Sequence, residues 1–353
     1  MTVSDTKKKG FDLGNWMIPI IAVAIAMFIA GIMMKLQGAD PISAYKTLFT
    51  TSFGSVAGFS ATLGKATPLV LSGLAVTIGL RAGLFNIGAQ GQLISGALAT
   101  AWAGYALTGL PAFIHLPIAL AFGIFFGGFV GYIAGALKAY RGVHEVITTI
   151  MLNSIIMALS DYLVVYHFRE PGQLLTRTSE IQKSARLPFI FSLPLGFFIA
   201  IACAVLAWWI MTNTTSGFRF ETVGRNKFAA WYAGISVKRT LVMAMMISGG
   251  IAGLGGAVET LGVTYRFEPA FNAGLGFDGI TIALLGRAHP LGIIPGAILI
   301  GGMRAGASNM QFVAGVATEL VDLLMALILF LVTAPLVTRF FKNTTSKSVT
   351  GGW

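Results

Sequence analysis

Long runs of apolar residues recur along the whole chain, and short polar segments separate them. Each run has about 20 residues, enough for a helix to cross the roughly 30 Å hydrocarbon core of a bilayer. Backbone amides inside lipid must find partners within their own segment, so these runs are expected to be helices. A membrane β-barrel is disfavoured because the runs are continuously apolar rather than alternating. The pattern predicts an all-α membrane protein with about ten transmembrane helices.

The eighth and ninth predicted spans are short, and Arg287, His289 and Pro290 separate them. They form either two full crossings or a broken, re-entrant hairpin. The first span follows three lysines at 7–9 and is too long for a cleavable signal sequence, so we expect it to be retained. The predicted spans cover residues 16–35, 57–80, 84–106, 114–137, 145–166, 189–211, 241–262, 276–287, 290–304 and 317–339.

Composition and charge fit this picture. Of the 353 residues, 56% are hydrophobic and 10% are charged, whereas a soluble domain carries about 25% charged residues. The net charge of +11 comes from basic residues in short loops. Cytoplasmic loops of membrane proteins carry an excess of Lys and Arg, so we interpret the charge as a signal for orientation in the membrane rather than for a nucleic-acid partner. Both termini are placed in the cytoplasm, and one transmembrane domain is expected over 1–353. Its cytoplasmic parts are residues 1–15, the loop 212–240 and the tail 340–353, and its long outer loop is 167–188.

Glycines recur every fourth residue in the fourth predicted span, at Gly123, Gly127, Gly131 and Gly135. They share one helix face and allow a second helix to approach closely, which is a main source of helix association in lipid. The glycine-rich segment 249–257 is expected to act in the same way in the seventh span.

A second group of residues is polar at membrane depth. The segment NIGAQGQ (86–92) mixes amides with glycines. Its glycines permit an unwound stretch that lines a solute pathway, but the amides could equally bond across helices. The candidate pathway residues are Asn86, Gln90, Gln92, Asn153 and Asp278.

Acidic residues within spans are costly and are functional hypotheses by default. For each one, an ion pair or an interfacial position is favoured over contact with solute, and Arg287 and Arg304 are available partners for Glu319 and Asp322. A rival interpretation is an ion-coupled secondary transporter that uses Glu319, Asp322 or Asp278. The complete set is Glu145, Asp161, Glu259, Asp278, Glu319 and Asp322.

Several catalytic signatures fail on inspection. HEVIT at 144–148 lacks the second histidine of a zinc protease, and no strand precedes the G-x-G-x-x-G match at 274–279. GKA at 64–66 lacks the spacing of a phosphate-binding loop, so the chain is expected to have no ATPase site of its own. Cys203 is the single cysteine and has no metal-site partners. Neither a catalytic residue nor a metal site is predicted.

The inner loop 212–240 carries the segment KFAAWYAG (227–234), a predicted short helix that ends at Gly234. Phe228, Trp231 and Tyr232 are expected to be exposed on the cytoplasmic side beside small alanines. Exposed aromatics of this kind suit docking into a groove on a partner. The alternative is an interfacial helix whose aromatics touch lipid headgroups.

Five segments together resemble the permease family of ABC importers for simple sugars and nucleosides, and the nucleoside-type subgroup most of all. They lie in the family's order: GLFNIGAQGQL (83–93), VHEVITTIMLN (143–153), VGRNKFAAWYAGISV (223–237), ISGGIAGLGGAVETLG (247–262) and GFDGITIALLGRAHPLGIIPGAI (276–298). Ala89-Gln90 depart from the pattern, because many relatives carry a glycine-glutamate pair there.

The resemblance implies a multi-pass subunit of a prokaryotic cytoplasmic (inner) membrane, in contact with membrane lipid. Its implied partners are a second permease subunit, identical or homologous, a cytoplasmic ATP-binding subunit and an extracytoplasmic solute-binding protein. No cofactor is implied in this chain, since ATP and magnesium would bind the partner ATPase. The implied substrate is a nucleoside, with a simple sugar such as a pentose as the alternative. The implied ATPase-coupling residues are Glu221, Gly224, Arg225, Asn226, Ala229, Ala230, Tyr232, Ala233, Gly234 and Ile235.

Overall fold

The computed structural model describes residues 13–269 and 274–346, and this part of the chain is mostly helical. Two short strands, β1 (Phe189–Ile190) and β2 (Leu193–Pro194), pair antiparallel. The helices are α1 (Leu13–Leu36), α2 (Pro41–Phe53), α3 (Val56–Arg81), α4 (Ala89–Ala106), α5 (Ala112–Arg141), α6 (Glu145–Tyr166), α7 (Leu195–Asn213), α8 (Thr215–Arg225), α9 (Lys227–Tyr232), α10 (Val237–Glu259), α11 (Leu275–Leu285), α12 (Ile293–Ala314) and α13 (Glu319–Ser346), with a 3-10 turn at Lys183–Ala185 and a π-helix at Thr260–Thr264.

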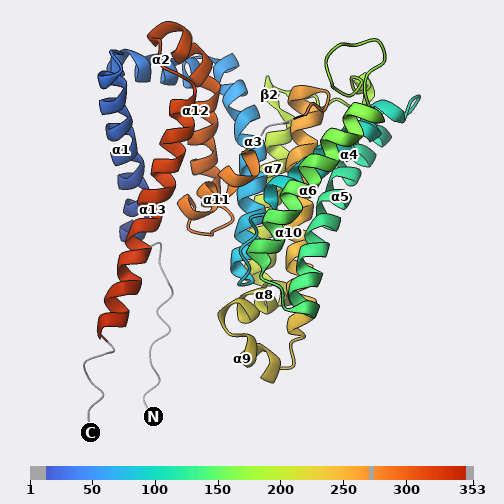
Figure 1. The fold of residues 1–353 in the computed structure, drawn as a ribbon, viewed down its shortest axis with the longest axis vertical. Coiled ribbons are helices and arrows are strands. Elements are labelled where there is room, and N and C mark those ends of the chain that lie inside the picture. The colour runs from blue at the N-terminus through green and yellow to red at the C-terminus, as the bar shows by residue number, and fades with distance from the viewer. Residues whose placement is uncertain (1–12, 270–273, 347–353) are drawn as a thin grey trace.

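Six of the described helices are long and apolar enough to cross a bilayer, namely α1, α3, α5, α6, α7 and α10. Each of the ten predicted segments coincides with a helix, which confirms the all-α class. The chain is therefore a multi-pass membrane protein, while the count of ten spans stays a prediction. Figure 1 shows α8 and α9 at one end of the molecule and the outer loop at the other. The C-terminal end of α13 lies toward the same end as α8 and α9.

The glycine stripes of α5 and α10 pack directly against each other, as the sequence predicts. A Cβ atom added at Gly127 would lie 2.6 Å from Gly253 Cα, and one added at Gly131 would lie 3.1 Å from Gly249 Cα. Separations this short leave no room for a side chain, so the two backbones are in contact. This close approach is the helix-packing role expected for small residues in lipid.

Two predicted spans begin later in the structure than in the sequence analysis. The sixth span was expected from residue 189, but α7 begins at Leu195, after the hairpin of β1 and β2. Pro194 has no backbone N–H to extend the pairing and stands at the position before the helix, where its fixed φ suits a helix start. The third span was expected from residue 84, but residues 82–88 are a non-helical turn, in which Gly83 has a φ of 72°.

The eighth and ninth predicted spans differ greatly in length. α11 has 11 residues, about 16 Å of rise, and so reaches only about half-way through a bilayer. α12 runs to Ala314, beyond the predicted end at residue 304. Arg304 does not end the helix because Asp278 and Asp322 neutralise its charge. Gly315, at a φ of 66°, follows the last residue of α12 instead.

Helix α2 was not predicted, although the sequence carries a signal for it. Asp40 accepts hydrogen bonds from the backbone amides of Ile42 and Ser43, and Pro41 occupies the first helical position. An aspartate cap followed by proline is a typical helix start. The helix has too few apolar residues to register as a span.

The long outer loop is fastened to the end of α10 by backbone hydrogen bonds. Thr178 N–H donates to Phe267 O at 2.9 Å, Ile181 N–H to Tyr265 O at 3.0 Å, and Leu187 N–H to Leu261 O at 2.9 Å. Ion pairs add to this attachment, since Arg266 contacts both Glu170 and Glu180. The loop and the segment after α10 therefore form one ordered rim.

Candidate functional site

The unwound turn before α4 is held by a buried network of amides. Asn86 Nδ2 donates to Gln92 Oε1 and to Ser248 Oγ of α10, each at 2.8 Å. Ser248 Oγ in turn donates to Ala75 O of α3 at 2.6 Å. Asn86, Gln92 and Ser248 are all buried. The network therefore ties the turn to α3 and α10.

The other two amides connect the same region to α6 and α11. Asn153 Oδ1 accepts from Gly91 N–H at 2.8 Å, and Asn153 Nδ2 donates to Ile87 O at 3.0 Å. Gln90 Oε1 accepts from Gly276 N–H at 2.7 Å, in the first turn of α11. This bond serves one of the helix N–H groups that has no partner within its own helix.

Asp278 is the fifth predicted pathway residue, and it lies apart from the amides in an ion-pair group. Arg304 Nη2 of α12 is 2.6 Å from Asp278 Oδ2 and 3.3 Å from Asp322 Oδ1 of α13. One arginine thus joins α11, α12 and α13. Arg304 was predicted as a partner of Asp322, and the structure adds Asp278 as a second partner.

The structure brings Asn86, Gln90, Gln92 and Asn153 together, but as bonds between helices rather than as a cavity wall. The predicted unwinding at 86–92 is observed for residues 86–88. Of the two interpretations left open, the geometry in this conformation favours cross-helix bonding. Contact of these residues with solute stays a prediction.

A polar cavity of about 330 Å³ lies between α3, α10, α12, α13 and the start of α11. Lys65 Nζ is 3.6 Å from Glu259 Oε1, and the Glu259 side chain is only 1% exposed. The lining comprises Lys65, Pro68, Glu259, Leu275, Arg304, Ala307, Ser308, Thr318, Glu319, Val321 and Asp322. Lys65 was not among the predicted site residues. A lysine inside an otherwise apolar span was the signal that could have found it.

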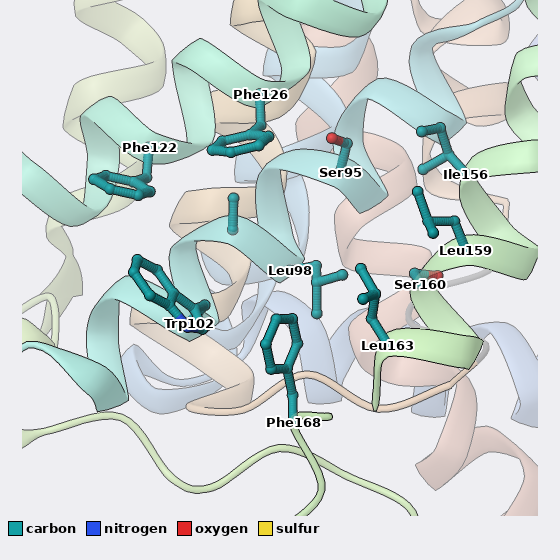
Figure 2. A pocket seen from close by; sticks show the side chains of 11 residues that line it. Ser95, Leu98, Trp102, Phe122, Phe126, Ile156, Leu159, Ser160, Leu163 and Phe168 are labelled. Atoms are coloured by element: carbon teal, nitrogen blue, oxygen red, sulfur yellow. The ribbon is translucent and has the colours of Figure 1, made fainter. Parts of the chain in front are cut away.

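A second cavity, of about 450 Å³, opens between α4, α5 and α6. Figure 2 shows Trp102, Phe122 and Phe126 on one side of it and Ile156, Leu159 and Leu163 on the other. Ser160, one of its two serines, donates its hydroxyl to Met157 O at 2.7 Å. The lining is almost wholly apolar, so this cavity does not suit a hydroxylated solute.

The inner loop 212–240 folds into α8 and α9, which project from one end of the molecule (Figure 1). The helix predicted over 227–234 is observed as α9, and Gly234 follows it at a φ of 75°. Asn226 starts this helix, because its Oδ1 accepts from Phe228 N–H at 2.9 Å and from Ala229 N–H at 3.0 Å.

Four residues of the predicted coupling set anchor this loop to the rest of the helical bundle. Ala230 is fully buried in a cluster with Ala82, Phe220 and Leu241, and Ile235 packs against the same cluster. Gly224 contacts the backbone at Arg81 and Gly83, where no side chain would fit. Glu221 adds an ion pair to Arg81 at 3.7 Å and one to Arg225 at 2.6 Å.

The remaining residues of the set are exposed, together with the neighbouring aromatics Phe228 and Trp231. The side chains of Phe228, Trp231 and Tyr232 are 79%, 65% and 82% exposed. The exposed members of the predicted set are Arg225, Asn226, Ala229, Tyr232, Ala233 and Gly234. We call Phe228, Ala229, Trp231, Tyr232 and Ala233 the α9 face.

Comparison with known proteins gives consistent matches over nearly the whole chain. A family model described as "Branched-chain amino acid transport system / permease component" matches residues 58–333. The guanosine ABC transporter permease protein NupP of Bacillus subtilis (strain 168) is 39% identical over 93% of this chain and 96% of that protein. The nucleoside ABC transporter permease protein NupB of Lactococcus lactis subsp. cremoris (strain MG1363) is 35% identical over 90% of each. The glucose ABC transporter permease protein TsgB13 of Haloferax volcanii is 34% identical over 92% of this chain and 88% of that protein.

Proposed function

The chain belongs to the permease-component family of branched-chain amino acid transport systems, and from this premise we propose that it is the transmembrane subunit of an ATP-binding cassette importer for nucleosides. The observation that carries the substrate class is the similarity to NupP and NupB, at 39% and 35% identity over nine-tenths or more of the chain. The protein is a membrane permease component rather than an enzyme.

A simple sugar is the second candidate substrate, and a specific observation supports it. The glucose permease TsgB13 is 34% identical over a similar length. Nucleosides and sugars share hydroxyl groups, so one polar pathway can serve either class. Higher identity to the two nucleoside permeases favours the nucleoside.

We further propose the arrangement of the complex. The chain spans the cytoplasmic membrane of a prokaryote as a single domain with about ten helices, alongside a second permease subunit. Residues 1–15, 212–240 and 340–353 face the cytoplasm; 1–12 and 347–353 lie outside the described residues. ATP and magnesium bind a separate cytoplasmic subunit, and a solute-binding protein delivers substrate to the outer rim.

The α9 face is proposed to seat on the ATP-binding subunit. Three large aromatic side chains are exposed on six residues of helix, and the same helix is anchored underneath by Ala230. Aromatic residues are enriched at protein interfaces because each covers a large apolar area. Since Gly224 is packed on Gly83, movement of the ATPase would be passed directly to the turn before α4. This supports an alternating-access cycle that is driven from the cytoplasmic side.

The test is transport by the reconstituted complex. The chain, its partner permease, the ATP-binding subunit and the solute-binding protein are placed in proteoliposomes, and uptake of labelled guanosine, other nucleosides, ribose and glucose is measured. We expect nucleoside uptake that requires ATP and the ATP-binding subunit. Uptake by the chain alone under a proton or sodium gradient would instead establish the ion-coupled alternative that uses Glu319, Asp322 or Asp278.

A further inference from the structure

The polar cavity lies in the extracytoplasmic half of the molecule. In the proposed orientation α3 ends at the cytoplasmic side at Arg81, so Lys65 lies about 14 Å from the outer end of the helix at Val56. Glu259 is the last residue of α10, whose cytoplasmic start at Val237 is roughly 33 Å away. The outer loop bonds to Leu261, two residues further on. The cavity is therefore near the side from which a solute would enter.

The ion pair in this cavity is longer than a direct hydrogen bond. Lys65 Nζ and Glu259 Oε1 are 3.6 Å apart, beyond the roughly 2.7–2.9 Å of a charge-assisted hydrogen bond. The Lys65 side chain is 41% exposed while Glu259 is almost fully buried. A solute hydroxyl that enters the cavity would therefore meet Lys65 first, with Glu259 beside it in the same lining.

The charges of the lining favour a neutral solute over an anion. Two basic side chains, Lys65 and Arg304, face three carboxylates, Glu259, Glu319 and Asp322. Arg304 is already engaged by Asp322 and by Asp278. The remaining carboxylates would repel a phosphorylated solute, since like charges a few ångströms apart interact unfavourably at low dielectric.

A local irregularity of the backbone supports a functional role for Glu259. The α-helix stops at this residue, and the next five, Thr260–Thr264, form a π-helix. π-Helical turns are rare and occur frequently at functional sites. A buried acid at membrane depth is also costly, and such residues are therefore candidates for a functional role. The two features coincide at one wall of the cavity.

We infer that this cavity is a solute-contact site for a neutral, hydroxylated solute in the outer half of the membrane, where Lys65 and Glu259 hydrogen-bond its hydroxyl groups. The inference rests on the proposed function and deepens it, because it names the residues that the passing nucleoside or sugar touches. Weak binding suits the role, since a tightly held solute would not be released.

The test uses the complete reconstituted complex with Glu259→Gln and Lys65→Gln. Each variant loses one charged hydrogen-bonding partner, so we expect nucleoside uptake at least about 10-fold lower, with ATP hydrolysis and assembly of the complex retained. Lys65→Arg keeps the charge and should recover much of the uptake. Asp161→Asn is the matched control, because Asp161 is an exposed carboxylate on α6 that does not line the cavity.

The outcomes separate the site from the function. If the Glu259→Gln variant fails to assemble, the Lys65→Gln variant tests the site instead. The Lys65 side chain is 41% exposed, so its replacement leaves no hole in the packing. Uptake within about two-fold of wild type for both glutamine variants would overturn the solute-contact site and leave the proposed function intact. A wild-type complex that moves neither nucleosides nor sugars would overturn both.

Discussion

Gly224 in α8 lies with its backbone directly on that of Gly83, at the turn before α4. A Cβ atom at Gly83 would be 2.9 Å from Gly224 Cα. The loop that carries the α9 face is therefore in backbone contact with the segment that the buried amides hold in place.

Replacing Gly224 by alanine should break this contact. The added methyl group would collide with the carbonyl oxygen of Arg81, and overpacking of this kind costs about 1–3 kcal/mol. We expect a lower melting temperature in detergent and reduced coupling of ATP hydrolysis to uptake. Gly64→Ala is the control, because the space around that helical glycine is open. If the two variants have the same melting temperature and the same coupling, the Gly224 contact contributes to neither.

Removing the exposed aromatics of α9 should weaken association with the ATP-binding subunit without unfolding the chain. Phe228→Ala and Tyr232→Ala remove side chains that are mostly exposed, so their effect on stability should stay within about 0.5 kcal/mol. Loss of a central interface aromatic typically costs about 2 kcal/mol or more in binding, and co-purification of the two subunits would report it.

Ala230→Trp offers the contrasting case to those two substitutions. Ala230 is buried under the helix, so bulk at this position should lower thermal stability as well as association. If the two alanine variants bind the ATP-binding subunit with unchanged affinity, α9 is instead an interfacial helix.

The amide network should contribute measurably to stability. Asn86→Ala would leave the hydroxyl of Ser248 and the amide of Gln92 without one partner each in a buried site. An unsatisfied buried polar group costs about 1–3 kcal/mol. Thermal unfolding in detergent is the measurement, and Asn213→Ala, on the exposed end of α7, is the control. A melting temperature unchanged from wild type would show that the network does not hold the turn.

The pair of Arg304 and Asp278 should behave as a coupled unit. Asp278 is 12% exposed and Arg304 is 24% exposed, so removing one partner leaves a poorly solvated charge. We expect Arg304→Gln to cost about 1.5–3 kcal/mol, and Arg304→Gln with Asp278→Asn to cost less than the sum of the two single changes. Additive losses of stability in this double-mutant cycle would show that the two groups act independently.

Local sequence patterns accounted for much of the fold, because lipid leaves few alternatives to helices. The glycines every four residues in α5 and the helix stop at Gly234 could also be predicted, because each is a local sequence pattern. The end of α12 was not, because Arg304 looks like a boundary until its two carboxylate partners, 26 and 18 residues away, are placed beside it.

The candidate site was harder to predict than the fold. The amides at 86–92 were identified, but whether they face a cavity or other helices depends on the packing of α3, α6, α10 and α11. Lys65 and Glu259 are almost 200 residues apart in the sequence, and nothing local in either segment indicates that they meet. Such a pairing is a property of the tertiary arrangement.

The fit of α5 against α10 limits how the molecule can change shape. At Gly127 and Gly253 the two backbones are in direct contact, so sliding or tilting one helix against the other would bring main-chain atoms into collision. We therefore expect α5 and α10 to move together as one rigid body. Any motion that opens the pathway first to one side of the membrane and then to the other is expected in less tightly packed elements, such as the short helix α11 and its neighbours.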